Sequence, residues 1–222
     1  KVRKNYSNFL DMCKEPKICA ELALQPIERF NLDASILFSD ILTIPDALNL
    51  GLGFHEGEGP KFSNPISSTD DVNNIDTFDV NSLDYVFRAV EETKNLIPAN
   101  LPLIGFCGSP WTLAAYSIEG GGSKDFQKTK TFMAENPNAL HDFLEILSDA
   151  CYQYLKQQVL SGINAIQIFD SWADLLSEDE LDLFSLSYTK KITQKLKNDP
   201  ITKHIPIILF EKNPNKDITD LI

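Results

Sequence analysis

The sequence has few arginines and no long apolar run. Only three arginines occur, Arg3, Arg29 and Arg88, and acidic residues outnumber Lys and Arg by 32 to 20, which gives a formal net charge of −12. Because such a surface repels polyanions, we expect neither a nucleic acid nor an anionic membrane as a partner. No apolar stretch approaches the roughly 18 residues that a membrane-spanning helix requires. These features predict a soluble protein.

Cysteine is scarce and scattered. The four cysteines, Cys13, Cys19, Cys107 and Cys151, form no CxxC pair and have no histidine at ligand spacing, so no zinc or other metal site is indicated. We expect them to be reduced thiols in helices and a buried strand, as in a cytoplasmic protein. The first residue is Lys1 rather than Met, so we expect the natural start and any targeting segment to lie outside this sequence.

Four short apolar runs alternate with longer segments of helical periodicity. The runs are expected to be buried strands and cover residues 34–38, 102–107, 164–169 and 205–210. The expected helices cover residues 16–30, 43–51, 82–96, 137–161 and 178–196, and a further helix is expected to begin at Ser109-Pro110. Pro26 is expected to kink or divide the first helix. Nearly all-apolar strands separated by helices indicate a parallel sheet covered on both faces, either a (β/α) barrel or an open doubly wound sheet.

Two loops have ligand-like compositions without ligand-like spacing. The stretch from His55 to about Asp84 is expected to be a solvated loop, since its aspartates lack the pattern of a calcium-binding EF-hand. The segment Glu119–Ser123 contains three glycines but follows a helix and lacks the lysine spacing of a phosphate-binding loop, so it is interpreted as a flexible turn. His141 and His204 are interpreted as structural residues because no triad-like grouping includes them.

Polar residues follow the carboxyl ends of three expected strands. They are Asp40 after the first, Ser109 and Tyr116 after the second, and Asp170 and Ser171 after the third. In a parallel barrel, this end of the strands carries the active site. Position alone leaves two interpretations of Asp40 open: a catalytic carboxylate, or a cap, supplied by Ser39 or Asp40, for the helix that begins near Ile44.

Five segments resemble the uroporphyrinogen decarboxylase family, in the same order and with similar spacing. They are LQPIERF (24–30), ILFSDIL (36–42), GEGP (57–60), PLIGFCGSPWTLAAYSIEGGGSK (102–124) and IFDSWADLL (168–176). The resemblance implies an α/β fold, a (β/α)8 TIM barrel of which residues 1–222 supply the first part as a single domain, incomplete at both ends. It also implies a homodimer that converts uroporphyrinogen III to coproporphyrinogen III without a metal or organic cofactor.

The resemblance further implies roles for individual residues. Asp40 is expected to bind the pyrrole N–H groups of the tetrapyrrole and to stabilise the cation that forms when a ring carbon is protonated. Tyr116 is expected to be the second catalytic residue. The expected substrate-binding residues are Arg3, near a carboxylate, Phe38, Phe106 and Phe169 at apolar positions, and Ser171 with its hydroxyl.

The resemblance also has gaps, and two alternatives remain. The family's arginine-rich RQAGR segment is expected before Lys1 and its histidine-bearing NLGHG segment beyond Ile222, so residues 1–222 alone are expected to be inactive. Asp174 stands where a glycine is usual, and the residues after Phe210 depart from the family. One alternative is a zinc-dependent corrinoid methyltransferase of the related barrel group, which needs a His-x-Cys pair that this sequence lacks. The other is a truncated barrel that acts as a non-catalytic binding protein.

Overall fold

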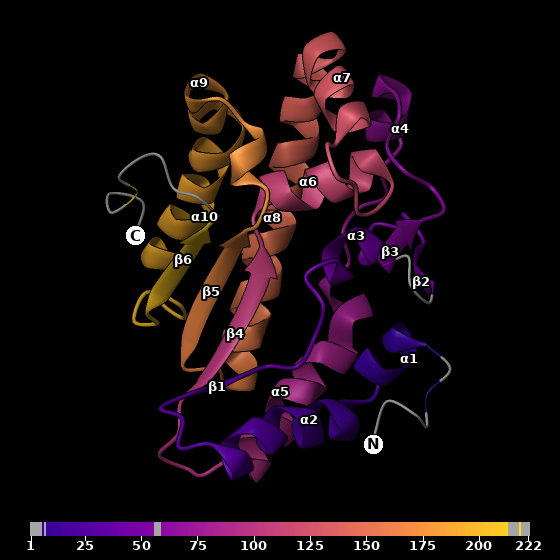
Figure 1. Cartoon of the computed structure of the whole chain (residues 1–222). Helices are drawn as coiled ribbons and strands as arrows, with labels where there is room; N and C mark the ends of the chain where they lie inside the picture. Colours follow the sequence, from indigo (N-terminus) through magenta and orange to yellow (C-terminus); the bar gives the residue numbers. More distant parts are fainter. Residues whose placement is uncertain (1–5, 7, 56–58, 213–217, 219–222) are drawn as a thin grey trace.

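A parallel sheet of four strands organises the chain. The computed structural model describes residues 6, 8–55, 59–212 and 218. The strand order is β1-β4-β5-β6, with β1 at Ser35–Ile36, β4 at Leu103–Gly108, β5 at Ala165–Asp170 and β6 at Ile207–Glu211. All three pairings are parallel, so the four carboxyl ends meet at one edge, at the upper end of the sheet in Figure 1. The four expected strands are confirmed, although in the first strand only two residues, Ser35 and Ile36, form strand pairing.

Helices fill the connections between the strands. They are α1 (Phe9–Cys13), α2 (Pro16–Arg29), α3 (Thr43–Ala47), α4 (Thr69–Asn73), α5 (Asp84–Leu96), α6 (Pro110–Glu119), α7 (Gln127–Glu135), α8 (Pro137–Ser161), α9 (Glu178–Glu180) and α10 (Ser187–Asn198). The expected helices are therefore present, and α2 continues through Pro26 as one helix instead of being divided. Among the helices of the described chain, none combines the length and apolarity needed to cross a bilayer.

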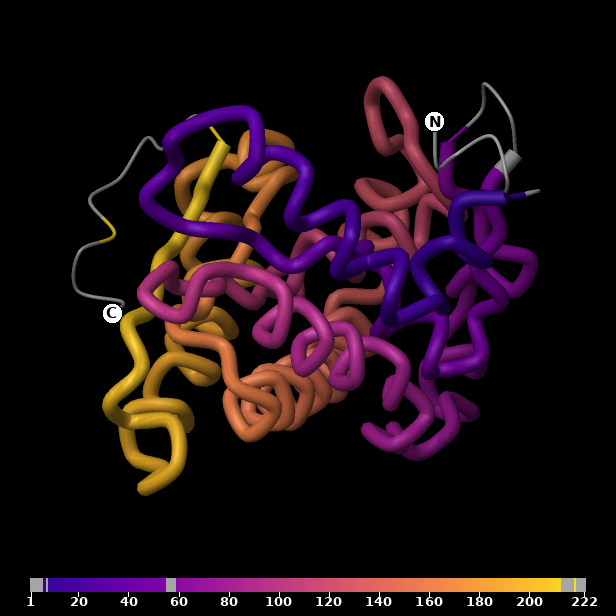
Figure 2. Tube along the Cα trace, turned by 90° about the horizontal axis from the view of Figure 1, so that it is seen from below, coloured from indigo at the N-terminus to yellow at the C-terminus, as the bar shows by residue number. Residues whose placement is uncertain are grey.

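The helix α8 shows how the sequence determines this packing. It begins with Pro137 at its first turn and ends at Gly162, whose φ of 114° is readily adopted only by glycine. Gln158 near its end is fully buried and joins the helix to β4: its side chain accepts the backbone N–H of Phe106 at 3.0 Å and donates to the Phe106 carbonyl at 2.9 Å. In Figure 2, α8 is seen nearly along its axis with α5 beside it.

The two faces of the sheet differ in cover. On β5, Ile166 and Ile168 are buried, whereas alternate residues such as Phe169 are only partly buried. On β6, Ile208 and Phe210 lie on the same side of the sheet as Phe169, and they are 40% and 45% exposed. Helices α8 and α10 lie behind the strands in Figure 1. In the described chain, helices therefore cover one face of the expected parallel sheet, and we call the other side, with Phe169 and Phe210, the open face.

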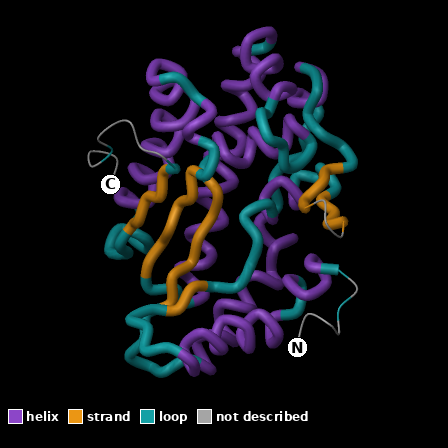
Figure 3. The backbone as a smooth tube through the Cα atoms, in the orientation of Figure 1, coloured by secondary structure: helices purple, strands orange, loops and turns teal. Residues whose placement is uncertain are grey.

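The segment expected to be a loop between residues 55 and 84 contains regular structure. An antiparallel hairpin pairs β2 (Leu52–His55) with β3 (Gly59–Phe62), seen apart from the main sheet in Figure 3. The strands are short and include glycine and proline, so the sequence shows no alternation that would reveal them. The three-glycine turn is attached to this hairpin, because the Phe62 N–H donates to the Gly120 carbonyl at 3.0 Å.

The last long helix is less regular than its periodicity suggests. Ser177 and Glu180 form a capping box at its start. The backbone then passes through a π-helical stretch at Leu181–Leu186 before α10 begins. This change of pitch accompanies a tertiary contact, since Ser185 in the π-helical stretch donates a hydrogen bond to the buried Asp170 carboxylate.

Candidate functional site

Asp40 lies in the turn that follows β1 at the carboxyl end of the sheet. Its Oδ1 atom accepts the backbone N–H of Leu42 at 2.7 Å, which closes a local turn. Helix α3 begins after Leu42, and no side chain caps its first N–H groups. The interpretation of Ser39 or Asp40 as the cap of this helix is therefore wrong, because Asp40 bonds the N–H of Leu42, which precedes the helix, and not an N–H of its first turn.

The Asp40 carboxylate has an unusual electrostatic position. Burial raises its pKa above the ordinary value, and the single hydrogen bond from Leu42 offsets this only in part. No second hydrogen bond to Asp40 is found within residues 8–55 and 59–212. A carboxylate that is poorly hydrated and mostly unbonded has strong capacity to bind N–H donors or a nearby positive charge.

Tyr116 projects from α6 toward the same edge of the sheet. Its half-buried ring meets Trp172 edge to face, with ring centres 5.7 Å apart, and meets Phe126 in the same way at 6.0 Å. Burial raises the pKa of its hydroxyl, and the negative charge of Asp40 raises it further. The nearby Trp172 N–H and the Lys212 ammonium lower it. The structure thus brings Asp40 and Tyr116 into one electrostatic neighbourhood, with the phenol protonated.

Three of the expected apolar residues lie on the open face near this edge. Phe106 on β4 and Phe169 on β5 meet edge to face with ring centres 5.6 Å apart. Phe38 follows β1 and contacts Phe9, at 6.0 Å between ring centres. Phe210 on β6 continues the row, 5.8 Å from Phe169. Phe210 is not among the site residues expected from the sequence, although its place in the fourth apolar run, level with Phe169, is a signal for it.

The remaining expected residues differ in their positions. Ser171 directly follows β5 and is half-buried, at the same edge as Tyr116. Arg3 lies outside the described residues. The two other arginines, Arg29 at the end of α2 and Arg88 on α5, are both exposed on helices. A cation that sequence reasoning missed, Lys212, directly follows β6.

Asp170 at the end of β5 is a buried carboxyl whose partners are protein hydroxyl groups, as expected of a structural residue. It is 6% exposed, accepts a hydrogen bond from Thr112 Oγ1 at 2.9 Å and accepts another from the Ser185 hydroxyl. Burial raises its pKa, while the Ser185, Thr112 and Ser109 hydroxyls lower it. This carboxyl is already saturated by protein donors, whereas Asp40 has a single hydrogen bond and is available to a ligand.

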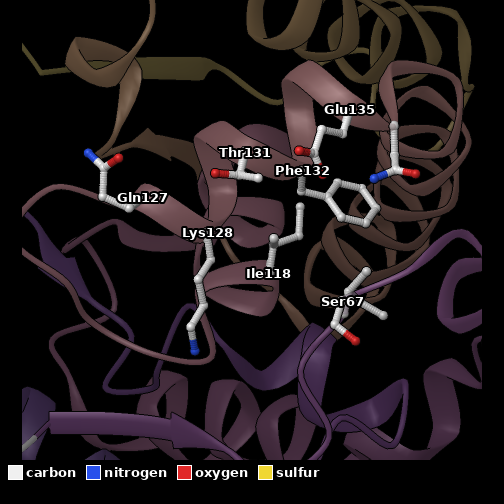
Figure 4. A pocket seen from close by; sticks show the side chains of 9 residues that line it. Ser67, Ile118, Gln127, Lys128, Thr131, Phe132 and Glu135 are labelled. Carbon is white, nitrogen blue, oxygen red and sulfur yellow. The ribbon is translucent and has the colours of Figure 1, made fainter.

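The described residues also contain cavities away from this edge. One of about 350 Å³ lies beside α6 and α7, and its lining includes Ile118, Lys128, Phe132 and Glu135 (Figure 4). None of the expected site residues lines it. The four cysteines are buried and unpaired in α1, α2, β4 and α8, as expected. In the part of the chain that the structure describes, no three His, Cys, Asp or Glu side chains are grouped as metal ligands would be.

Fold and site together define a class: a parallel α/β protein of barrel type whose strand ends present a carboxylate, a tyrosine and a row of phenylalanines. The chain belongs to the uroporphyrinogen decarboxylase family (URO-D), which it matches over residues 1–222. It is 50% identical over 206 residues to the uroporphyrinogen decarboxylase of Ruthia magnifica subsp. Calyptogena magnifica, covering 92% of this chain and 59% of the relative. It is 47% identical over 221 residues to that of Acinetobacter baylyi, covering 99% and 62%.

These relatives are longer than the chain, which spans about 60% of their length. A solved structure of a methyltransferase from Methanosarcina mazei is also similar, with a TM-score of 0.68 and 18% identity over 91% of this chain and 58% of that one. At this identity the likeness shows the fold alone. It agrees with a (β/α) barrel of which these residues form the first part.

Proposed function

We propose that the natural polypeptide that carries this sequence is a uroporphyrinogen decarboxylase. It would convert uroporphyrinogen III to coproporphyrinogen III by removing the four acetate carboxyls, without a metal or organic cofactor. Family membership supports the reaction class. The observation that carries the proposal is the state of Asp40: a poorly hydrated carboxylate with a single backbone hydrogen bond, at the edge where barrel enzymes carry their chemistry.

The proposed chemistry assigns Asp40 an electrostatic role. Protonation of an electron-rich pyrrole carbon gives a cation, and the acetate arm then loses CO₂ as the electrons of its C–C bond flow into the ring. A second proton then adds to the former acetate carbon to give a methyl group, and loss of the first proton from the ring carbon restores the neutral pyrrole. A carboxylate already bonded to the pyrrole N–H groups stabilises the cation where it forms, with no reorganisation of solvent. The single protein bond to Asp40 leaves its other oxygen available for these N–H groups.

Tyr116 would assist at the same position as a hydrogen-bond donor. Its raised pKa keeps the phenol protonated at neutral pH, so the hydroxyl can donate to a substrate carboxylate. The aromatic contacts with Trp172 and Phe126 hold the ring in place. Tyr116 would therefore bind and orient an acetate arm next to the ring that Asp40 holds.

The other expected residues would form the binding surface. Phe38, Phe106 and Phe169 would contact the apolar faces of the pyrrole rings from the open face. The Ser171 hydroxyl would bind a polar substituent, and Arg3 would pair with a carboxylate. The row of phenylalanines supports this division, because a tetrapyrrole combines an apolar ring system with a charged periphery.

Further proposals concern the assembly. We propose that residues 1–222 belong to a single barrel domain, supported by the one continuous hydrophobic core and by β1 and β6, each of which has one strand neighbour in the described sheet. The domain would pair as a homodimer in the cytoplasm, where free, buried thiols persist. Neither nucleic acid nor membrane would be a partner, in keeping with the net charge of −12.

A turnover assay tests the proposed function. The natural polypeptide is purified, stripped of metal with a chelator and incubated anaerobically with uroporphyrinogen III, and the products are oxidised and separated by carboxylate number. We expect porphyrins with seven, six, five and finally four carboxylates. An enzyme that leaves all eight in place until a metal is restored would contradict the proposal, and stoichiometric zinc would favour the methyltransferase alternative. Binding without any turnover would favour a non-catalytic binding protein.

A further inference from the structure

A lysine, an aspartate and a tryptophan are joined at the carboxyl ends of β5 and β6. The Lys212 ammonium lies 2.9 Å from the Asp174 carboxylate and 5.0 Å from the centre of the Trp172 ring. Lys212 directly follows β6, and the other two residues belong to the turn after β5. An ion pair and a cation-π contact thus hold one ammonium at a defined place instead of leaving it on a free side chain.

This ammonium lies next to the proposed site. Asp170 pairs with Glu211 across the two strands, so Lys212 follows β6 at the level where Ser171 follows β5. The Trp172 ring beneath Lys212 also contacts Tyr116. The positive charge of Lys212 reaches the Tyr116 hydroxyl and contributes to lowering its pKa, against the larger effect of burial.

The ammonium also has capacity for another partner. A lysine carries three N–H donors, and the contact with Asp174 accounts for one of them. The Lys212 side chain is 44% exposed, whereas Asp174 is 25% exposed. The Trp172 Nε1 atom is buried, and within the described residues it makes no hydrogen bond of acceptable geometry. The Lys212 ammonium therefore keeps unused donor capacity at this edge, above the ring of Trp172, whose own N–H is buried.

We propose that Lys212 binds a carboxylate of an anionic ligand at this edge, and that Asp174 positions the ammonium and competes with the ligand for it. The inference deepens the proposed function and rests on it in one respect, the choice of a polycarboxylate tetrapyrrole as the ligand. Lys212 places a positive charge at this edge of the sheet. Arg29 and Arg88 do not, because they are exposed on α2 and α5.

Binding of uroporphyrin, an octacarboxylate that is not turned over, tests the inference without requiring catalysis. It is titrated into the natural polypeptide and into its variants, and quenching of tryptophan fluorescence is followed, since the described chain has a tryptophan beneath Lys212. Lys212→Met should weaken binding by about tenfold or more, the loss typical of a charge-assisted hydrogen bond. Lys212→Arg should keep most of the affinity. Asp174→Asn, which frees the ammonium, should tighten binding.

A matched control exists on another surface. Lys191 on α10 pairs with Glu145 and lies 4.7 Å from the centre of the Tyr188 ring, so it repeats the lysine, acid and aromatic arrangement away from the strand ends. Lys191→Met makes the same change in net charge, and it should leave uroporphyrin binding unchanged. Equal losses in Lys212→Met and Lys191→Met would overturn the inference, because a general charge effect would then explain both.

The direction in which Asp174→Asn changes the affinity shows whether Lys212 binds the ligand itself or only holds Trp172 in place. If Lys212 only holds Trp172 in place, Asp174→Asn and Lys212→Met should weaken binding alike, and that result would overturn the inference. Tighter binding by Asp174→Asn together with weaker binding by Lys212→Met supports the inference. Thermal melting checks that each variant is folded. Normal decarboxylation with no response to either variant would reject this site and keep the proposed function. These two opposite effects without decarboxylation would reject the proposed function and keep the site.

Discussion

The Thr112 hydroxyl donates a hydrogen bond to Asp170 at 2.9 Å, which ties the first turn of α6 to the end of β5. A second hydroxyl, from Ser185, reaches the other carboxylate oxygen. Asp170 is therefore a buried carboxyl with protein partners on both oxygens. Asp40, which follows β1 two strands away in the sheet, has one partner. This contrast indicates that Asp170 contributes to stability and that Asp40 is available to bind a ligand.

Thr112→Val should destabilise the fold and spare the chemistry. The substitution keeps the shape but removes a donor to a buried carboxyl, which typically costs about 1–3 kcal/mol of unfolding free energy. Because burial raises the Asp170 pKa, the native state binds the proton more tightly, and stability falls as pH rises from the unfolded to the folded pKa. Loss of the Thr112 bond should extend this fall to higher pH. Urea unfolding across pH measures both effects, and unchanged stability with lost turnover would contradict the structural role.

Tyr116→Phe should slow decarboxylation without disturbing the packing. The ring keeps its contacts with Trp172 and Phe126, so the melting temperature should stay near that of the parent. Loss of the hydroxyl should lower kcat/KM by about tenfold, or roughly 1.4 kcal/mol of transition-state stabilisation. Steady-state kinetics and thermal melting on the same preparation check this. An unchanged rate at limiting substrate would show that Tyr116 is only a packing residue.

The Asp199 cluster should govern part of the acid sensitivity. Asp199 accepts hydrogen bonds from Tyr152 at 2.5 Å and from the Ile201 N–H at 2.8 Å, and it pairs with Lys156 at 2.7 Å. The Lys156 contact is the main cause that lowers its pKa from 3.8 to about 2. A lowered pKa stabilises the fold above the unfolded value, and this contribution is lost as pH falls from about 3.8 to about 2. Asp199→Asn should flatten stability in that interval, as acid unfolding curves would show, and an unchanged curve would contradict the cluster's role.

Gly105→Ala should disturb the contact between β4 and α8. An added Cβ would lie 2.4 Å from Gln158 Oε1 and 2.6 Å from Ile163 Cδ1, closer than real contacts allow. Overpacking of this kind costs about 1–3 kcal/mol. Gly122→Ala is the control, since nothing lies within 4 Å of its added Cβ. Chemical denaturation of the two variants should differ by that amount, and equal stabilities would mean that the strand and helix separate easily.

Periodicity in the sequence predicts the parts of the fold that rest on local patterns. The α8 boundaries at Pro137 and Ser161 follow from proline at the start, glycine after the end and apolar residues at helical spacing. The β2–β3 hairpin has no such pattern and depends on contacts with the turn after α6. Likewise, no local rule could show that the Asp40 bond closes a turn rather than capping α3, because that depends on the path of the chain after β1.

The candidate site divides in the same way. Strand ends followed by polar residues could be found from the sequence, since the apolar runs are clear and parallel strands place their carboxyl ends together. The hydrogen-bond and ion-pair partners of those polar residues could not be found from the sequence. Asp170 is saturated by Thr112 and Ser185, and Lys212 meets Asp174, through contacts between segments distant in sequence.

The most direct test of the account is the pair of variants Asp40→Asn and Asp40→Glu in the natural polypeptide, with kcat and melting temperature measured together. Asn can keep the bond from Leu42 but loses the charge, so decarboxylation should fall by about 10²–10³. Because burial disfavours the charged form of Asp40, the melting temperature should stay level or rise. Glu should retain more activity than Asn if charge dominates over position. Normal decarboxylation by Asp40→Asn, with an early melt, would contradict the assignment of Asp40 as the catalytic carboxylate.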